Sequence, residues 1–236
     1  MRAWTLGAMG LVGAAAAWSA PAPACFSPPL ARALRIRLRL DAPTGVALTF
    51  DDGPHAAGTP AVLDELARAG VTATFFLVGE QVERTPSLAA EIAAAGHEVG
   101  VHGYGHRLHL RRRPNELAYD LDRAVAAVSE ASGTEPACYR PPYGVFSLAS
   151  LDLVRRRGLE PVLWSRWGRD WEAGATPAAV ARRVTADLGG GDVVLLHDAD
   201  HYSASGSWRR TAGALAAIVE SVRSRGDSFV ALSQST

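Results

Sequence analysis

Two neighbouring carboxylates stand where an apolar run ends. Asp51 and Asp52 follow the apolar residues 46–50 and precede a Gly-Pro turn. Adjacent side chains diverge at the end of a strand, so one carboxylate can bind a metal ion while its neighbour faces a water molecule. Asp-Asp-Gly-Pro is also ordinary turn chemistry, because Asp, Gly and Pro each favour turns. The motif gains chemical meaning only from the residues that accompany it.

Histidines with a ligand-like spacing follow about fifty residues later. His102 and His106 form H-x-x-x-H, a spacing that brings two imidazoles to one side of a helical turn, and His109 lies one further turn on. With Asp52 the pair makes an Asp-His-His set that leaves positions for water and substrate. Such a set suits Zn²⁺ or another divalent ion.

Three later segments carry further polar groups. Residues 140–144, Arg-Pro-Pro-Tyr-Gly, predict a rigid turn whose backbone N–H groups can hold an oxyanion, and Arg140 can orient a carboxylate bidentately. Asp170 precedes a tryptophan, and an apolar strand ends at His197. A histidine at that place is suited to be a general acid whose pKa a nearby carboxylate adjusts. A plain proline-rich loop and a core histidine are the alternative interpretations.

Five motifs in this order, TFDDGP, H-x-x-x-H, RPPYG, D-W and L-x-H, resemble the polysaccharide deacetylase family. This family is also called the NodB-homology group or carbohydrate esterase family 4. The resemblance implies one divalent metal ion, usually Zn²⁺ with Co²⁺, Ni²⁺ or Mn²⁺ as alternatives. It also implies a metal-dependent hydrolase that removes N-acetyl groups from amino sugars of a chitin-oligomer, peptidoglycan or exopolysaccharide type.

The resemblance assigns a role to each matching position. It implies Asp52, His102 and His106 as metal ligands, Asp51 as the base and His197 as the acid. Arg140 would orient the base, Asp170 would tune the acid, and the Tyr143 backbone N–H would donate to the oxyanion. The implied substrate-pocket residues are Trp171, Leu195 and Pro141.

Two positions depart from the family pattern. Gly103 follows the first metal histidine, where family members often have Ser or Thr, so the metal loop must be stabilised in another way. Trp167 stands three residues before the Asp170-Trp171 pair, where an Asp is common. Neither change removes a ligand, the acid or the base, so we expect activity and leave the substrate preference open.

Other functions compete with this interpretation. A glycosidase needs its two carboxylates across a glycosidic bond, whereas Asp51 and Asp52 are adjacent. An O-acetyl esterase acting on xylan-like glycans, a cyclic-amide hydrolase of the same superfamily and a non-catalytic carbohydrate-binding protein are the alternatives. The polar and aromatic residues 198–208 either stack on sugar or pack over the mouth of the barrel.

Strand and helix patterns alternate along the chain. We expect strands at 46–50, 72–78, 97–101, 137–139, 160–164, 192–196 and 229–232. The expected helices begin near Thr59, Pro86, Pro114, Ser147, Thr176 and Arg209. Strict alternation implies parallel strands with crossover helices. About seven such units predict an α/β fold, a distorted and incomplete (β/α) barrel in a single domain.

The composition bounds the class of protein. Of 236 residues, 48% are hydrophobic and 20% charged, which is typical of a globular chain. Twenty-four basic and 24 acidic residues give zero formal net charge, so the electrostatic footprint of a general nucleic-acid binder is absent. With only Cys25 and Cys138, a cysteine-rich zinc module is excluded. We expect one deacetylase-like domain over residues 44–236, a monomer whose partner is an acetylated polysaccharide or oligosaccharide.

The first residues have a different character. Residues 3–31 carry no charge, and small-residue cleavage sites fall near residues 19–24. We expect residues 1–24 to be a signal-like or membrane-associated segment and the protein to be extracytoplasmic. An apolar helix packed on the domain and a cytoplasmic location are the alternatives, because arginines in the basic lead-in at 25–43 compete with Arg2 under the positive-inside rule. The alternation at 35–40 predicts an edge strand with a solvated arginine face, in preference to contact with an anionic polymer.

Overall fold

The computed structural model describes residues 16–235, and residues 1–15 of the predicted apolar segment lie outside this range. Seven parallel strands of the described chain form one sheet in the order β5-β4-β3-β2-β1-β7-β6. The strands are β1 (Ala47–Asp51), β2 (Thr74–Leu77), β3 (Glu98–Val101), β4 (Cys138–Tyr139), β5 (Glu160–Pro161), β6 (Arg166–Trp167) and β7 (Val193–His197). The predicted incomplete barrel of about seven strands in a single domain is confirmed.

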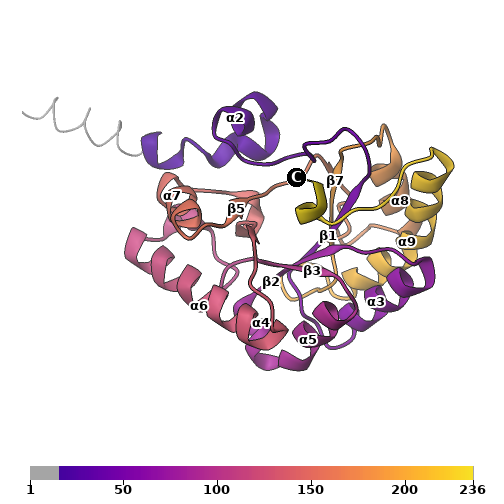
Figure 1. Ribbon diagram of the computed structural model, residues 1–236, viewed down its shortest axis with the longest axis horizontal. Coiled ribbons are helices and arrows are strands. Elements are labelled where there is room, and N and C mark those ends of the chain that lie inside the picture. Colours follow the sequence, from indigo (N-terminus) through magenta and orange to yellow (C-terminus); the bar gives the residue numbers. More distant parts are fainter. Residues whose placement is uncertain (1–15, 236) are drawn as a thin grey trace, which may run out of the picture.

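Helices cover the outside of the curved sheet. The α-helices are α2 (Pro28–Ala33), α3 (Gly58–Ala69), α4 (Gly79–Arg84), α5 (Pro86–Ala94), α6 (Pro114–Ser132), α7 (Leu148–Arg156), α8 (Pro177–Thr185) and α9 (Ser207–Ser224). Short 3-10 turns are η1 (Ala22–Phe26), η2 (His109–Arg111), η3 (Pro142–Gly144) and η4 (Leu232–Ser235). Figure 1 shows α3 to α9 in an arc around the strands, with α2 on the open side of the arc.

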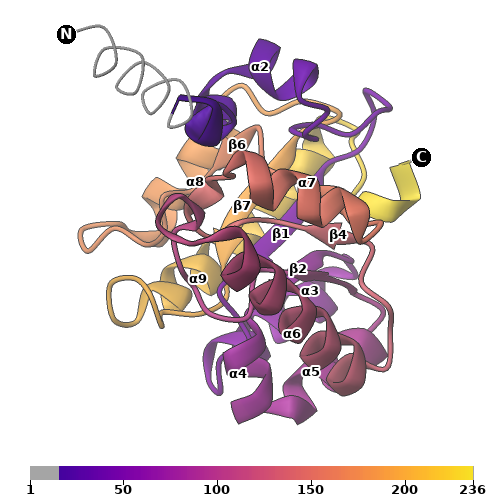
Figure 2. The same ribbon diagram turned by 90° about the vertical axis from the view of Figure 1, so that its left-hand side faces the viewer.

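The centre of the sheet is apolar on both faces. Every residue of β1 and β2 is buried, and the Phe50 and Phe75 rings stack at 4.9 Å between centroids. Parallel strands covered on both faces require such continuous apolar runs. β1 and β7 run side by side through the middle of the molecule (Figure 2), with Asp51 opposite His197. The chemical motifs therefore meet at the carboxyl edge of the sheet.

Two local predictions were wrong, and one helix was missed. Residues 229–232 do not form a strand: Phe229 makes an isolated bridge to Val46, and β6 occupies an outer position in the sheet instead. The short helix α4 was not predicted. Thr59 lies inside α3 and does not cap it, because its hydroxyl accepts from the His55 N–H and donates to Asp198.

Residues 36–40 close the open side of the sheet. Arg37 exchanges backbone hydrogen bonds with Pro161 and Leu163 at the β5 edge, and the Leu40 N–H donates to the Gly191 carbonyl just before β7. The predicted solvated arginine face is wrong for Arg37, whose side chain is only 7% exposed and pairs with Asp41 and Glu160. These residues form bridges rather than a named strand, and they join the two sides of the gap in the barrel.

Both cysteines are free thiols, Cys25 half-buried and Cys138 buried. The turn η1 spans the boundary between the predicted signal-like segment 1–24 and the predicted lead-in 25–43, and α2 lies within the lead-in. None of the helices in residues 16–235 is both long and apolar enough to cross a lipid bilayer.

The Arg37 contacts generate a stability prediction. Arg37→Ala removes ion pairs to Asp41 and Glu160 and a hydrogen bond to the Leu232 carbonyl, so we expect the free energy of unfolding to fall by about 1–3 kcal/mol. Urea unfolding followed by circular dichroism measures this change. The control is Arg32→Ala at an exposed position of α2, which should stay within about 0.5 kcal/mol of the parent. Equal losses in both variants would contradict a role for Arg37 in closing the barrel.

Candidate active site

A cavity of about 370 Å³ opens at the carboxyl edge of the sheet. It is lined by Asp51, Asp52, His102, His106, Tyr143, Gly144, Trp164, Trp167, Trp171, Leu195, His197, Tyr202 and Ser203. Eight of the eleven predicted site residues are in this lining. Arg140 and Asp170 lie behind it, both fully buried. Pro141 is not in the lining; its carbonyl accepts the Gly144 N–H within the turn.

Asp51 and Asp52 both face this cavity, although adjacent side chains were expected to diverge. The strand ends at Asp51, and Asp52 has a φ of 74°, in the left-handed region. Alternation of side chains across the sheet therefore stops between the two residues. Such a backbone costs about 1–3 kcal/mol for a residue other than glycine, and Asp tolerates it better than most. The result is two carboxylates within reach of the same imidazole.

The loop that carries His102 and His106 is not helical, which corrects the prediction of a helical turn. Its backbone turns at Gly103, where φ is 82°. Asp120 on α6 accepts hydrogen bonds from the N–H groups of Tyr104 (2.8 Å) and Gly105 (3.3 Å). The Asp120 carboxylate thus stabilises the histidine loop, in which Gly103 stands where family members often have Ser or Thr. The two imidazole rings still come together, with centroids 5.3 Å apart.

Ligand atoms of Asp52, His102 and His106 lie within 4.8 Å of one another. The Nε2 atoms of His102 and His106 are 3.4 and 3.3 Å from Asp52 Oδ1. His102 Nδ1 donates to the Arg140 carbonyl at 2.9 Å, so its Nε2 carries the lone pair that points at the carboxylate. Asp52 Oδ1 is buried without a hydrogen-bond partner among the described residues. Two imidazole nitrogens and an unpaired carboxylate oxygen that converge on one point fit a cation.

The protonation states agree with that fit. Burial raises the pKa of Asp52, but contact with His102 and the charges of His197 and His106 outweigh it and lower the pKa to about 2. Burial lowers the pKa of His106 to about 4. Near neutral pH the carboxylate is ionised and the imidazole neutral, as metal ligands must be.

His109 belongs to the core instead. It is buried, its Nε2 lies 3.1 Å from the Tyr139 hydroxyl, and burial lowers its pKa to about 3. The cluster of ligand atoms does not include it.

Arg140 holds Asp51 from behind the cavity. Its Nη1 donates to Asp51 Oδ1 and to the Thr49 hydroxyl, both at 2.7 Å, and its Nη2 donates to the Leu163 carbonyl at 2.8 Å. The guanidinium lies 4.1 Å from the centroid of the Phe76 ring. Oδ1 is thereby engaged, while Oδ2 remains on the side of His102, 3.8 Å from its Nε2. This leaves one carboxylate oxygen directed at the reaction site.

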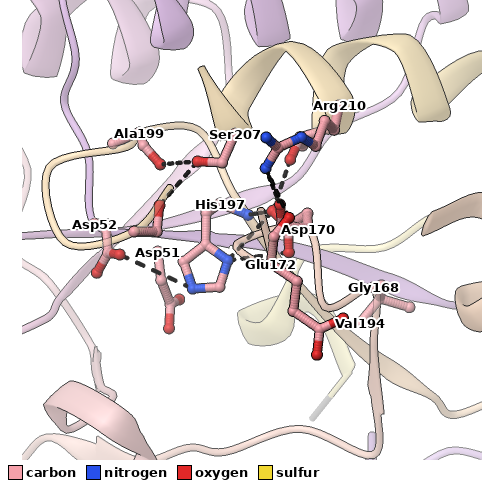
Figure 3. Close-up of polar contacts among 12 residues, drawn as sticks. Asp51, Asp52, Gly168, Asp170, Glu172, Val194, His197, Ala199, Ser207 and Arg210 are labelled. Atoms are coloured by element: carbon pink, nitrogen blue, oxygen red, sulfur yellow. Dashed lines mark hydrogen bonds and ion pairs between the residues drawn. The ribbon is translucent and has the colours of Figure 1, made fainter. Parts of the chain in front are cut away.

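His197 lies between two carboxylates (Figure 3). Its Nδ1 is 3.2 Å from Asp170 Oδ1, and its Nε2 is 4.0 Å from Asp52 Oδ2. Asp170 also accepts from the His197 N–H (2.8 Å) and the Thr211 hydroxyl (2.7 Å), and Arg210 donates to its carbonyl. Burial disfavours protonation, but the charge and hydrogen bond of Asp170 outweigh it and raise the pKa of His197 to about 10. The imidazole is thus a proton donor at neutral pH.

Aromatic and apolar side chains form the rest of the cavity wall. Trp171 meets the His197 ring edge-on at 5.3 Å, and Trp167 meets Trp171 at 5.8 Å. Leu195 on β7 is buried beside them. Tyr143 has a φ of 61°, and the hydrogen bonds within its turn are donated by the N–H groups of Gly144 and Val145. Its oxyanion role remains a prediction.

Three buttressing residues were not predicted from the sequence. Asp120 holds the histidine loop as described above. Asp198 is fully buried behind Gly53, bonds to Thr59, and burial raises its pKa to about 7. Tyr202 stacks on His106. Asp198 and Tyr202 had a signal, because both lie in the polar and aromatic segment 198–208 that follows His197, whereas Asp120 had none.

Comparisons with known sequences point to one family. The family profile described as "Polysaccharide deacetylase" matches residues 41–162. A peptidoglycan-N-acetylglucosamine deacetylase of Bacillus cereus is 34% identical over 191 residues, which are 80% of this chain and 86% of that protein.

Two solved structures are similar along most of the chain. The Bc1960 peptidoglycan N-acetylglucosamine deacetylase, in complex with a hydroxybenzamide compound, has a TM-score of 0.79 and 29% identity, covering 85% of this chain and 92% of that one. A family 4 acetyl xylan esterase from Clostridium thermocellum, in complex with a cobalt ion, has a TM-score of 0.74 and 30% identity, covering 80% and 89%. With its motifs gathered around one cavity and these matches over most of its length, the chain belongs to the polysaccharide deacetylase family.

Proposed function

We propose that this protein hydrolyses N-acetyl groups of amino sugars in a polysaccharide, with peptidoglycan as the first substrate to test. One observation carries the proposal. A carboxylate held by arginine (Asp51), an imidazole held by aspartate (His197) and an Asp-His-His ligand set line the same cavity. Amide hydrolysis needs a base for water, an acid for the amine and stabilisation of an oxyanion, and this cavity offers all three.

Asp52, His102 and His106 would hold one divalent metal ion. Such an ion lowers the pKa of water and polarises the acetyl carbonyl when bound. We favour Zn²⁺, since two imidazoles and a carboxylate suit it, with Co²⁺, Ni²⁺ and Mn²⁺ as alternatives.

Asp51 is the proposed general base. Arg140 engages Oδ1, so Oδ2 is left to take a proton from the water that attacks the acetyl carbon. The Tyr143 N–H is proposed to donate to the oxygen that becomes negatively charged. Trp171 and Leu195 would enclose the acetyl methyl group, because both line the cavity with apolar surface.

His197 is the proposed general acid. When the carbon–nitrogen bond breaks, the nitrogen takes a proton from Nε2, so that a neutral amine leaves and acetate remains. Asp170 binds Nδ1 and keeps Nε2 facing the cavity. An O-acetyl ester is a second candidate substrate, favoured by the similarity to the acetyl xylan esterase, because the same base and ligand set would serve it.

An extracytoplasmic location belongs to the same proposal, because the B. cereus relative is named for a cell-wall substrate. Cleavage in the apolar segment should leave a mature N terminus between residues 20 and 25, which N-terminal sequencing of exported protein checks. Intact Met1 in a soluble cytoplasmic pool would overturn it.

The decisive activity test is acetate release from acetylated peptidoglycan, chitin oligomers and acetyl xylan, with and without a chelator. Absence of acetate release from all three would reject the proposed function.

The two adjacent carboxylates should separate by function. Asp51→Asn should abolish turnover and retain about one metal ion per chain, because its oxygens serve the proton. Asp52→Asn should lose the metal as well as the activity, because the amide oxygen is a much weaker ligand. Elemental analysis of both purified variants measures the metal content. Loss of metal in the Asp51 variant alone would reverse the two assignments.

The acid should matter most when the leaving group is an amine. We expect His197→Ala to reduce deacetylation of N-acetylglucosamine oligomers by about two to four orders of magnitude. Hydrolysis of an aryl acetate should fall much less, because a phenolate leaves without protonation. Both rates are measured on samples of equal metal content. Equal losses would show that His197 supports the site without donating the proton.

Asp170→Asn should move the pH profile. The negative charge of Asp170 raises the pKa of His197, and the acid must be protonated to act. Removing the charge lowers that pKa, so the alkaline limb of the activity profile should move to lower pH by about 1–3 units. Measuring kcat between pH 6 and pH 11 tests the shift. An unchanged alkaline limb would mean that another group sets it.

A further inference from the structure

His106 lacks the outer hydrogen bond that fixes most metal-binding histidines. Its Nδ1 is buried, with no hydrogen-bond partner in the part of the chain that the structure describes. His102 does have such a bond, to the Arg140 carbonyl. A ligating imidazole usually donates its second N–H to a carboxylate, carbonyl or water, which orients the ring. Some other contact must therefore hold the His106 ring toward Asp52.

Two tyrosines supply ring contacts. Tyr202 lies flat on His106, with 4.2 Å between centroids and 11° between planes. Tyr143 meets the same imidazole edge-on, with 4.5 Å between centroids and 60° between planes. The His106 side chain is only 5% exposed, so its ring is enclosed by these neighbours. Stacking over one whole face restricts rotation of the imidazole about its side-chain bonds.

Tyr202 is itself held at its hydroxyl. The hydroxyl donates to Glu80 Oε1 at 2.6 Å and accepts from Gln81 Nε2 at 2.9 Å. Both partners are on α4, whose first N–H groups, from Gly79 and Glu80, donate to the carbonyls of Gly103 and Tyr104. The same short helix thus holds the backbone of the histidine loop and the ring that covers His106.

We propose that Tyr202 is a positioning residue for the metal ligand His106, with its ring replacing the missing outer hydrogen bond. The proposal rests on the metal site of the proposed function. In this role, the Tyr202 ring stacks on His106 and holds this ligand in place from the segment 198–208. A role for Tyr202 only in stacking on sugar is the competing outcome.

Three variants separate these outcomes. Tyr202→Leu removes the ring, Tyr202→Phe keeps the ring without its hydroxyl, and Tyr119→Leu removes an exposed tyrosine on α6 as a control. Affinity for Zn²⁺ is measured by competition with a chromogenic chelator, and ligand geometry by the visible absorption of the Co²⁺ form. We expect Tyr202→Leu to weaken Zn²⁺ binding about 10–100-fold and to change the Co²⁺ bands, Tyr202→Phe to weaken it less, and the control to match the parent.

Unchanged Zn²⁺ affinity and Co²⁺ bands in Tyr202→Leu would overturn the proposal, and a higher KM for oligosaccharide would then assign Tyr202 to substrate. A parent protein that binds neither ion would instead reject the proposed metal site. If Tyr202→Leu does not fold, Tyr202→Phe and Glu80→Ala decide, since both keep a ring at 202 and remove the hydrogen bond between residue 202 and Glu80. A severalfold loss of Zn²⁺ affinity in both supports the proposal, and parent-like affinity in both overturns it.

Discussion

A single buried cation organises the floor of the cavity. The Arg140 side chain is fully buried, and its guanidinium is hydrogen-bonded to Asp51, Thr49 and the Leu163 carbonyl. Its own carbonyl accepts from His102 Nδ1. One residue at the end of β4 therefore orients the proposed base with its side chain and a proposed metal ligand with its backbone. A buried charge without its partner is costly, so Arg140 and Asp51 must be present together.

This dependence couples distant parts of the chain. Asp51 ends β1, His102 follows β3, and Leu163 lies just after β5, so the Arg140 contacts join three strands in addition to its own. On the other side of the cavity, Asp170 binds His197 and Thr211, which joins a loop after β6 to β7 and α9. The proposed base and acid are thus each supported by a buried partner of opposite charge.

Most of this arrangement could be predicted from the sequence, because parallel strands present their carboxyl ends at one edge of the sheet. Once the alternation of strands and helices was recognised, Asp51, His102, Arg140 and His197 had to lie near one another. The backbone conformations within the motifs could not be predicted in the same way. The left-handed backbone at Asp52 reverses the expected divergence of the carboxylates, and the loop after β3 brings its histidines together without a helix. The sequence showed no sign of Asp120 and did not pair Tyr202 of the segment 198–208 with His106, because these contacts span 16 and 96 residues of chain.

Residues 36–40 determine where the folded domain begins. The family profile begins at residue 41, whereas the backbone bonds that close the gap beside β5 come from residues before it. A chain that began at residue 41 would leave the Pro161 carbonyl and the Leu163 N–H without the Arg37 partner they have here. Unpaired strand edges recruit other chains and promote aggregation. The folded domain of this protein therefore begins before the region by which its family is recognised.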